Sequence, residues 1–171
     1  RLITTEPEKA SSAPDSVPRQ KERGVDTPPF WAASWKDRPM DTSPIVHELT
    51  LTLSPTLRRS NVELTDDLPA GVTLDSYPGP LSQVLMNIIN NAVVHAFAEQ
   101  AEPRIEVHGQ VSVGQLTLTL IDNGCGIPTE HLSRVFDPFF TTRLGQGGSG
   151  LGMHIVYSMV TELLGGSVHL D

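Results

Sequence analysis

Residues 122–153 read DNGCGIPTEHLSRVFDPFFTTRLGQGGSGLGM, and the interpretation of the whole chain depends on this stretch. A carboxylate stands at the start of a glycine turn, an aromatic segment follows, and a glycine-rich loop opens a helix. Five of the eight residues from 145 to 152 are glycine, which lets backbone N–H groups approach an anion at the positive end of that helix. The stretch therefore predicts a nucleotide site, while the glycines alone would also suit a flexible surface loop.

Two well-known glycine motifs do not fit this stretch. Residues 145–150 have the G-x-G-x-x-G spacing of the dinucleotide fingerprint, but that motif follows a strand directly, and residues 139–143 read FFTTR. A Walker A loop is excluded because Leu151 stands where lysine should follow the last glycine. At the other end, Asp122 can accept a hydrogen bond from an exocyclic amine of a flat ligand, or it can cap a plain turn.

An amphipathic helix is predicted for residues 81–97, upstream of the glycine turn. Its apolar positions follow helical spacing and form one wide face: Leu81, Val84, Leu85, Ile88, Ile89, Ala92, Val93 and Ala96. At about 100° per residue, Asn87 and Asn91 lie together on one flank of that face, with His95 one turn further along. Amide oxygens can complete the coordination of a Mg²⁺ ion already held by phosphates, although asparagine on a helix flank is usually only solvated.

The remaining periodicity predicts a mixture of strands and helices. Strands are expected at residues 62–65, 72–75, 104–113, 115–121 and 167–170, and helices at 45–57, 129–135 and from 149 or 150 to 164. The last helix is expected to turn these residues inward: Leu151, Ile155, Val156, Met159, Leu163 and Leu164. Residues 1–44 contain seven of the fourteen prolines, so residues 1–40 are predicted to be a linker or loosely attached arm.

Charge and cysteine content narrow the classes of function. Twelve Lys and Arg against twenty Asp and Glu give a net charge of −8, which argues against a nucleic-acid binder. Cys125 is the only cysteine, so no intrachain disulfide forms and a cytoplasmic location is expected. No apolar run approaches the ~18 residues that span a bilayer, so no membrane contact is expected from this segment, although a parent protein could be membrane-anchored elsewhere.

Four motifs in a fixed order resemble the ATP-binding domain of sensor histidine kinases. They are QVLMNIINNAVVHAF at 83–97, DNGCGI at 122–127, FDPFFTTR at 136–143 and GGSGLGM at 147–153, followed by LGG at 164–166. The resemblance covers residues 41–171 and extends to the superfamily of DNA gyrase and mismatch-repair ATPases. It implies a Bergerat-type ATP-binding fold, an α/β two-layer sandwich with helices on one face of a mixed, mostly antiparallel sheet. The last strands that the family normally has are expected to be missing.

The resemblance also implies a set of site residues and two cofactors, ATP and Mg²⁺. Asn91 resembles the metal ligand of the family, with Asn87 as a second contributor, and Asp122 resembles the carboxylate that reads adenine. Arg143 is the implied phosphate contact. The other nucleotide-binding positions implied by the motifs are His95, Gly124, Gly126, Ile127, Phe136, Thr141, Thr142, Gly147, Gly148, Ser149, Gly150, Leu151 and Gly152.

The resemblance implies transfer of the γ-phosphoryl group of ATP to a histidine in a dimerisation domain of the same protein, with a response regulator downstream. Gyrase-type ATPases carry glutamate at the position of Asn87 to activate water, and asparagine cannot act as that base, so transfer is favoured over hydrolysis. His47 lies only 40 residues before Asn87, so the acceptor histidine is expected outside this chain. The alternatives are a non-catalytic nucleotide-binding regulatory module and a serine kinase of the anti-sigma-factor type.

Overall fold

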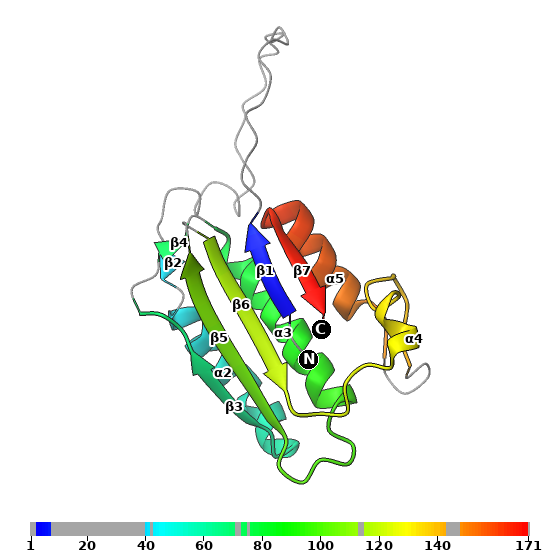
Figure 1. Cartoon of the computed structure of the whole chain (residues 1–171). Coiled ribbons are helices and arrows are strands. Elements are labelled where there is room, and N and C mark those ends of the chain that lie inside the picture. The colour runs from blue at the N-terminus through cyan, green and yellow to red at the C-terminus, as the bar shows by residue number, and fades with distance from the viewer. Residues whose placement is uncertain are drawn as a thin grey trace, which may run out of the picture.

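The structure is a computed structural model that describes residues 3–7, 40–41, 43–70, 73–74, 76–112, 115–142 and 148–170 (Figure 1). Its strands are β1 (Ile3–Pro7), β2 (Met40–Asp41), β3 (Glu63–Asp67), β4 (Thr73–Leu74), β5 (Arg104–Ser112), β6 (Gln115–Asp122) and β7 (Gly166–Leu170). Its helices are α2 (Ser43–Arg59), α3 (Pro78–His95), α4 (Thr129–Leu132), α5 (Gly152–Ser158) and the π-helical turn η1 (Met159–Leu163). No helix in these described ranges is long and apolar enough to cross a membrane.

The described elements form two layers. The main sheet has the strand order β3-β5-β6-β1-β7, and β2 pairs with β4 in a separate two-stranded sheet. The β3–β5 pair is parallel and all other pairs of the main sheet are antiparallel. Helices α2, α3 and α5 lie behind one face of this sheet (Figure 1). The predicted α/β sandwich with a mixed, mostly antiparallel sheet is therefore confirmed.

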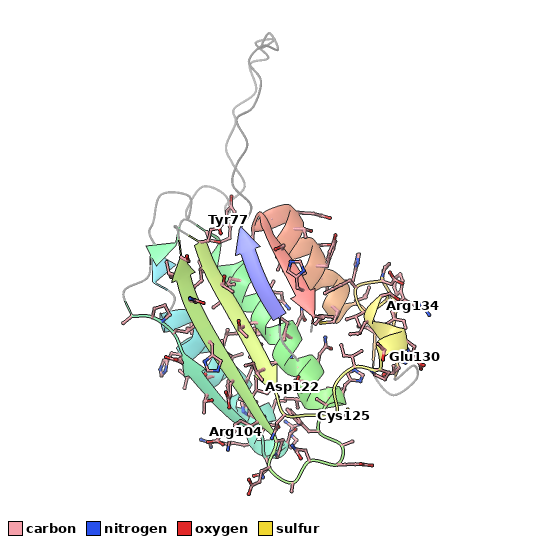
Figure 2. All side chains as sticks on the ribbon, in the orientation of Figure 1. Tyr77, Arg104, Asp122, Cys125, Glu130 and Arg134 are labelled. Atoms are coloured by element: carbon pink, nitrogen blue, oxygen red, sulfur yellow. The ribbon has the colours of Figure 1, made fainter. Side chains whose placement is uncertain are left out.

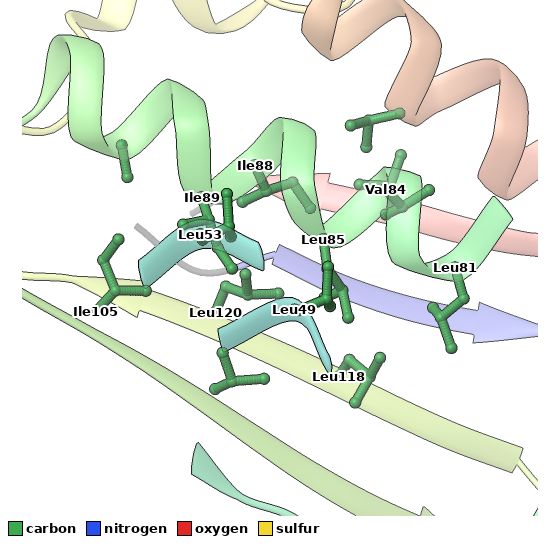
Figure 3. Packing of buried hydrophobic residues seen from close by; sticks show 14 of the residues in the cluster. Leu49, Leu53, Leu81, Val84, Leu85, Ile88, Ile89, Ile105, Leu118 and Leu120 are labelled. Atoms are coloured by element: carbon green, nitrogen blue, oxygen red, sulfur yellow. The ribbon is translucent and has the colours of Figure 1, made fainter. Parts of the chain in front are cut away.

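The core lies between α3 and the two long central strands. The apolar face of α3 is buried from Leu81 to Ala92, as its helical spacing predicts. On the sheet side, Ile105 and Leu118 point into the same layer, and α2 adds Leu53 (Figure 3). Burying a leucine or isoleucine side chain contributes about 1.5–3 kcal/mol of stabilising free energy. This layer is therefore the main source of the stability that holds α3 against β5 and β6.

Strand β1 corrects the expectation that residues 1–40 are a loosely attached arm. Ile3–Pro7 lies inside the sheet, between β6 and β7 (Figure 1). It pairs with β7 over five positions, from Ile3↔Leu170 to Pro7↔Gly166, and with β6 at Thr4↔Thr119. The sequence ITTEP is rich in β-branched residues, which suit a strand. The expectation of a loose arm followed instead from the proline content of the whole segment. The boundary near residue 40 otherwise remains a prediction.

The helix before β7 differs from its expected form. It begins at Gly152, and its last turn is the π-helical turn η1. Val160, four residues after Val156, is fully buried as ordinary helical spacing allows, while Leu163 in the wider turn, expected inside, is 38% exposed. Val156 is fully buried as predicted. A period of 3.6 residues per turn cannot anticipate the exposure of Leu163, because a π-helical turn has hydrogen bonds from residue i to residue i+5.

Candidate nucleotide site

A cavity of about 760 Å³ lies between α3 and the segment that follows β6. It brings together predicted site residues from distant parts of the sequence. Those that line it are Asn87, Asn91, His95, Gly126, Ile127, Thr141, Thr142, Gly148, Ser149, Gly150 and Gly152. The structure thus places the asparagine flank of the helix opposite the glycine-rich loop, as a nucleotide site between the two segments requires.

Four of the described predicted positions do not line this cavity: Asp122, Gly124, Phe136 and Leu151. Gly124, Phe136 and Leu151 lie nearby and act through packing or backbone contacts. Arg143 and Gly147 lie outside the described residues.

Asp122 lies at the end of β6, in a separate narrow hollow that adjoins the larger cavity. The two spaces share Asn91 and Met153 as lining residues. The Asp122 Oδ1 atom accepts a hydrogen bond from the N–H of Gly124 at 3.0 Å. Among the described residues, Oδ2 has no hydrogen-bond partner, so one carboxylate oxygen is left to accept a bond from a ligand.

The turn after Asp122 is held against the C-terminal end of α3. The N–H of Cys125 donates to the carbonyl oxygen of Ala96 at 2.9 Å. A Cβ on Gly124 would lie 2.4 Å from the Cβ of Ala96, so only glycine permits this approach. Gly126 has φ +72°, which glycine adopts without strain. Figure 2 shows Asp122 and Cys125 together beside this end of the helix.

The side-chain amide of Asn87 has an unsatisfied donor. Its Nδ2 atom is buried and has no hydrogen-bond partner in the described part of the chain. Its Oδ1 atom is 3.4 Å from Nε2 of Gln83. A buried polar group without a partner costs about 1–3 kcal/mol, which points to a ligand group that completes this amide.

Asn91 faces the glycine-rich side of the cavity directly. A Cβ on Gly152 would stand 3.4 Å from Nδ2 and 3.5 Å from Oδ1 of Asn91. Glycine at residue 152 therefore leaves the amide room to reorient toward a ligand. Because Asn91 also borders the hollow at Asp122, it lies where the two halves of the site meet.

The aromatic segment is anchored at both of its ends. At one end, the carbonyl oxygen of Phe136 lies 3.1 Å from Nδ1 of His154 in α5. At the other end, the rings of Phe140 and His131 pack edge to face, with centroids 5.4 Å apart. The guanidinium carbon of Arg134 lies 4.7 Å from the centroid of the Phe140 ring. A cation over a ring is worth about 0.5–1 kcal/mol at an exposed position, so these contacts fix the base of the loop that follows.

Phe139, between these anchors, has an unusual conformation. Its φ is +65° and its side chain is 71% exposed. Gly150, with φ +67°, packs against its backbone: a Cβ on Gly150 would lie 2.4 Å from the carbonyl carbon of Phe139. The glycine-rich loop is therefore seated on the aromatic segment through a contact that only glycine allows.

The structure also places residues in the cavity wall that the sequence did not single out. They are Asn90, Val94, Cys125, Pro128, His131, Val135, Phe140 and Met153. Asn90 and Val94 lie on the same side of α3 as Asn87 and Asn91, so helical geometry could have found them. His131 had no such signal, because its place depends on how α4 packs against Phe140.

A family of known proteins matches this chain at the residues that build the site. The family model described as histidine kinase-, DNA gyrase B- and HSP90-like ATPase matches residues 77–171. This range includes α3, the turn after β6, the aromatic segment and the glycine-rich loop.

Curated relatives of the chain are named as sensor kinases and sensor proteins. The autoinducer 2 sensor kinase/phosphatase LuxQ of Vibrio cholerae is 38% identical over 98 residues, which are 53% of this chain and 11% of that protein. The C4-dicarboxylate transport sensor protein DctB of Pseudomonas aeruginosa is 35% identical over 124 residues, which are 71% of this chain and 20% of that protein. The chain thus spans only about a tenth to a fifth of these two relatives.

Solved histidine kinase domains share the fold. The nucleotide-free catalytic domain of the histidine kinase ThkA aligns with a TM-score of 0.64 at 21% identity, covering 77% of this chain and 90% of that one. The mycobacterial sensor histidine kinase MprB aligns with a TM-score of 0.58 at 27% identity, covering 74% of this chain and 79% of that one.

Proposed function

Because the chain belongs to the histidine kinase-, DNA gyrase B- and HSP90-like ATPase family, we propose that it binds ATP with Mg²⁺ and donates the γ-phosphoryl group to a protein histidine in two-component signalling. The observation that carries the proposal is Asn87, which lines a cavity whose opposite side is the glycine-rich loop and whose buried Nδ2 donor has no partner among the described residues, so that it can donate to a phosphate oxygen. A polyphosphate with its metal ion fits both features.

The base of the nucleotide belongs at Asp122 in this proposal. Its free Oδ2 accepts the exocyclic amine of adenine, while Oδ1 stays bonded to Gly124. Ile88, Ile89 and Met153 border the same hollow, whose volume of about 10 Å³ admits only the amine end of the base, so the ring itself would lie in the adjoining cavity of about 760 Å³. A carboxylate accepts hydrogen bonds but cannot donate them when ionised, so this end favours a base that presents an N–H donor.

The donor set of α3 fits Mg²⁺ rather than a metal held mainly by the protein. Asn91 borders both the cavity and the hollow and would offer one neutral amide oxygen, and Asn87 would add a second once its Oδ1, now 3.4 Å from Nε2 of Gln83, turns toward the metal. The described residues contain no group of three or more His, Cys, Asp or Glu side chains that could hold a metal ion. Mg²⁺ keeps several waters and takes few protein ligands beside substrate phosphates. When bound, it would neutralise negative charge on the phosphate oxygens.

The phosphate end is built from backbone and small polar side chains. Gly148, Ser149 and Gly150 lie on one side, with the hydroxyls of Thr141 and Thr142 next to them. Such groups donate hydrogen bonds to phosphate oxygens without a fixed positive charge. Arg143 remains the proposed cationic contact, at the start of the undescribed part of the loop.

The composition of the wall supports transfer over hydrolysis. None of the described residues that line the larger cavity is Asp or Glu, so this wall offers no carboxylate to activate a water molecule. A neutral imidazole attacks phosphorus through its own lone pair and needs no base. Positioning and charge neutralisation can then supply most of the rate, as in other phosphoryl transfers.

We propose that the acceptor is a histidine in a dimerisation domain of the same protein, on another segment or subunit, and that a response regulator receives the phosphoryl group next. The relatives named above are a sensor kinase/phosphatase and a sensor protein, and the neighbour ThkA has been crystallised in complex with the response regulator protein TrrA. Both features support an acceptor and a regulator as partners.

Two measurements test the proposal in sequence. Calorimetry with a non-hydrolysable ATP analogue and Mg²⁺ should show saturable binding to the folded chain, and its absence would contradict the whole proposal. A separate acceptor-helix domain incubated with the chain and labelled ATP should then gain an acid-labile, base-stable label, as phosphohistidine requires. An acid-stable label would indicate a serine kinase instead, and binding without any label would indicate a regulatory module.

A further inference from the structure

Asn123 joins the turn after β6 to the connection that leads into β5. Its side-chain Oδ1 accepts a hydrogen bond from the N–H of Arg104 at 2.8 Å. Its Nδ2 donates to the carbonyl oxygen of Glu102 at 2.8 Å. Both ends of the amide are therefore used, each in a bond of good length.

The backbone of Asn123 is bound to the same connection. Its N–H donates to the carbonyl oxygen of Arg104 at 3.2 Å, and its carbonyl oxygen accepts from Nε2 of Gln100 at 2.7 Å. All four polar groups of the residue thus contact residues 100–104. Figure 2 shows Arg104 and Asp122 side by side at this end of the sheet.

One of these bonds replaces a backbone bond at the end of the β5–β6 ladder. The register of β5 and β6 ends at Ile105↔Asp122, so the next facing pair is Arg104 and Asn123. In an antiparallel ladder such a pair exchanges two backbone bonds. Here the N–H of Arg104 bonds to the side chain of Asn123 instead, which frees the Asn123 carbonyl oxygen to turn toward Gln100. The chain can then leave the sheet immediately after Asp122.

Asp122 is held in position because it lies between two residues that are bound to other parts of the fold. On one side Asn123 fixes it to the start of β5. On the other, Cys125 binds the carbonyl oxygen of Ala96 at the end of α3. Asn123 is exposed and lines neither the larger cavity nor the narrow hollow. We infer that Asn123 is a positioning residue that sets base discrimination in the nucleotide site by fixing the carboxylate of Asp122.

This inference rests on the proposed function. It predicts an effect on ligand affinity that a residue with a purely stabilising role would not have. If Asn123 acts through Asp122, its loss weakens only ligands that bond to that carboxylate. ATP presents an exocyclic amine to Asp122, whereas inosine triphosphate has a carbonyl oxygen at that position and cannot make the bond. The affinity for the inosine nucleotide should therefore stay constant when Asn123 changes.

The experiment compares Kd values of non-hydrolysable ATP and inosine triphosphate analogues, with Mg²⁺, by calorimetry on the full chain. Asn123→Ala removes both side-chain bonds, and Asn123→Asp keeps the acceptor for Arg104 but loses the donor to Glu102. We expect Asn123→Ala to raise the Kd of the ATP analogue about three- to tenfold, the range set by one or two lost hydrogen bonds, with Asn123→Asp in between. The Kd of the inosine analogue should change less than about twofold, the scatter of a neutral substitution.

Two controls separate this role from general damage. Gln110→Ala removes another exposed amide from β5 and should leave both Kd values unchanged. In an Asp122→Asn background, Asn123→Ala should no longer change ATP affinity, because residues that act as one unit are not additive. If Asn123→Ala fails to fold, Asn123→Asp and Gln100→Ala test the same network with a smaller loss.

The outcomes are distinct from those of the proposed function. A wild-type chain that does not bind the ATP analogue contradicts both. A wild-type chain that prefers ATP over the inosine analogue, with the same preference in every folded Asn123 variant, overturns this inference and leaves the proposed function standing. An equal loss of affinity for both nucleotides also overturns it, because the effect would then not act through Asp122.

Discussion

Replacing Gly124 with alanine tests whether the turn after β6 is pressed against the end of α3. A Cβ on residue 124 would lie 2.4 Å from the Cβ of Ala96 and 2.5 Å from its carbonyl oxygen. One neighbour is backbone and the other is a methyl group with no freedom to move away, so the turn itself must shift. That shift breaks the 2.9 Å hydrogen bond from the N–H of Cys125 to the Ala96 carbonyl oxygen.

The size of the effect follows from two separate costs. Forcing an extra methyl group into a tight contact costs about 1–3 kcal/mol, and losing one backbone hydrogen bond costs about 0.5–1.5 kcal/mol. We therefore expect Gly124→Ala to lower the free energy of unfolding by about 2–4 kcal/mol. For a chain of this length that corresponds to a Tm lower by about 4–15 °C. Affinity for an ATP analogue should fall as well, because the displaced turn carries Asp122 with it.

Gly79→Ala is the matched control, since it makes the same chemical change at a position with free space. No atom lies within 4 Å of a Cβ on Gly79, which is in the first turn of α3. Alanine suits a helix better than glycine by up to ~1 kcal/mol, so this variant should be as stable as the wild type or slightly more stable. Urea unfolding and calorimetry measure both quantities. The reasoning fails if Gly124→Ala unfolds within about 0.5 kcal/mol of the wild type and binds the nucleotide equally well.

Two further substitutions test the metal end of the site and the core. Asn87→Ala removes the buried Nδ2 donor that has no partner among the described residues, so stability should stay constant or rise by up to ~1 kcal/mol. The gain in ATP-analogue affinity on adding Mg²⁺ should disappear, and calorimetry with and without Mg²⁺ would contradict the assignment if that gain persists. Leu85→Ala, at a side chain only 2% exposed, should cost about 2–5 kcal/mol in urea unfolding. Leu51→Ala, at a side chain 61% exposed, should stay within ~0.5 kcal/mol, and equal costs at the two positions would contradict the packing described here.

The sequence predicted those parts of the fold that depend on local periodicity. The eight apolar positions between residues 81 and 96 identified α3 and its buried face, because a helix that packs on a sheet must repeat its apolar residues every three or four positions. Strand β1 could not be found in this way. Its place between β6 and β7 depends on backbone pairing with partners more than 100 residues away, such as Thr4 with Thr119 and Ile3 with Leu170.

The candidate site shows the same division between local and tertiary information. The spacing of Asn87, Asn91 and His95 predicted one flank of a helix, and the structure places all three in the cavity wall. The sequence could not show why Gly124 must be glycine, because the contact that demands it is with Ala96, a residue of another element. His131 was missed for the same reason, since its position depends on the ring of Phe140.

A net charge of −8 opposes the binding of a ligand that carries a triphosphate, and the placement of the acidic residues resolves this conflict. None of the described residues that line the larger cavity is Asp or Glu; its polar groups are amides, hydroxyls, imidazoles and glycine backbone. The carboxylate of the site, Asp122, lies in the adjoining hollow, where the ligand is expected to donate a hydrogen bond. Repulsion between exposed charges is screened over about 8–10 Å at physiological salt, so acidic side chains elsewhere on the surface act weakly on the phosphates. In the proposed function, the local arrangement of donors and acceptors, rather than the total charge, therefore determines which end of the site would receive the base and which would receive the phosphates.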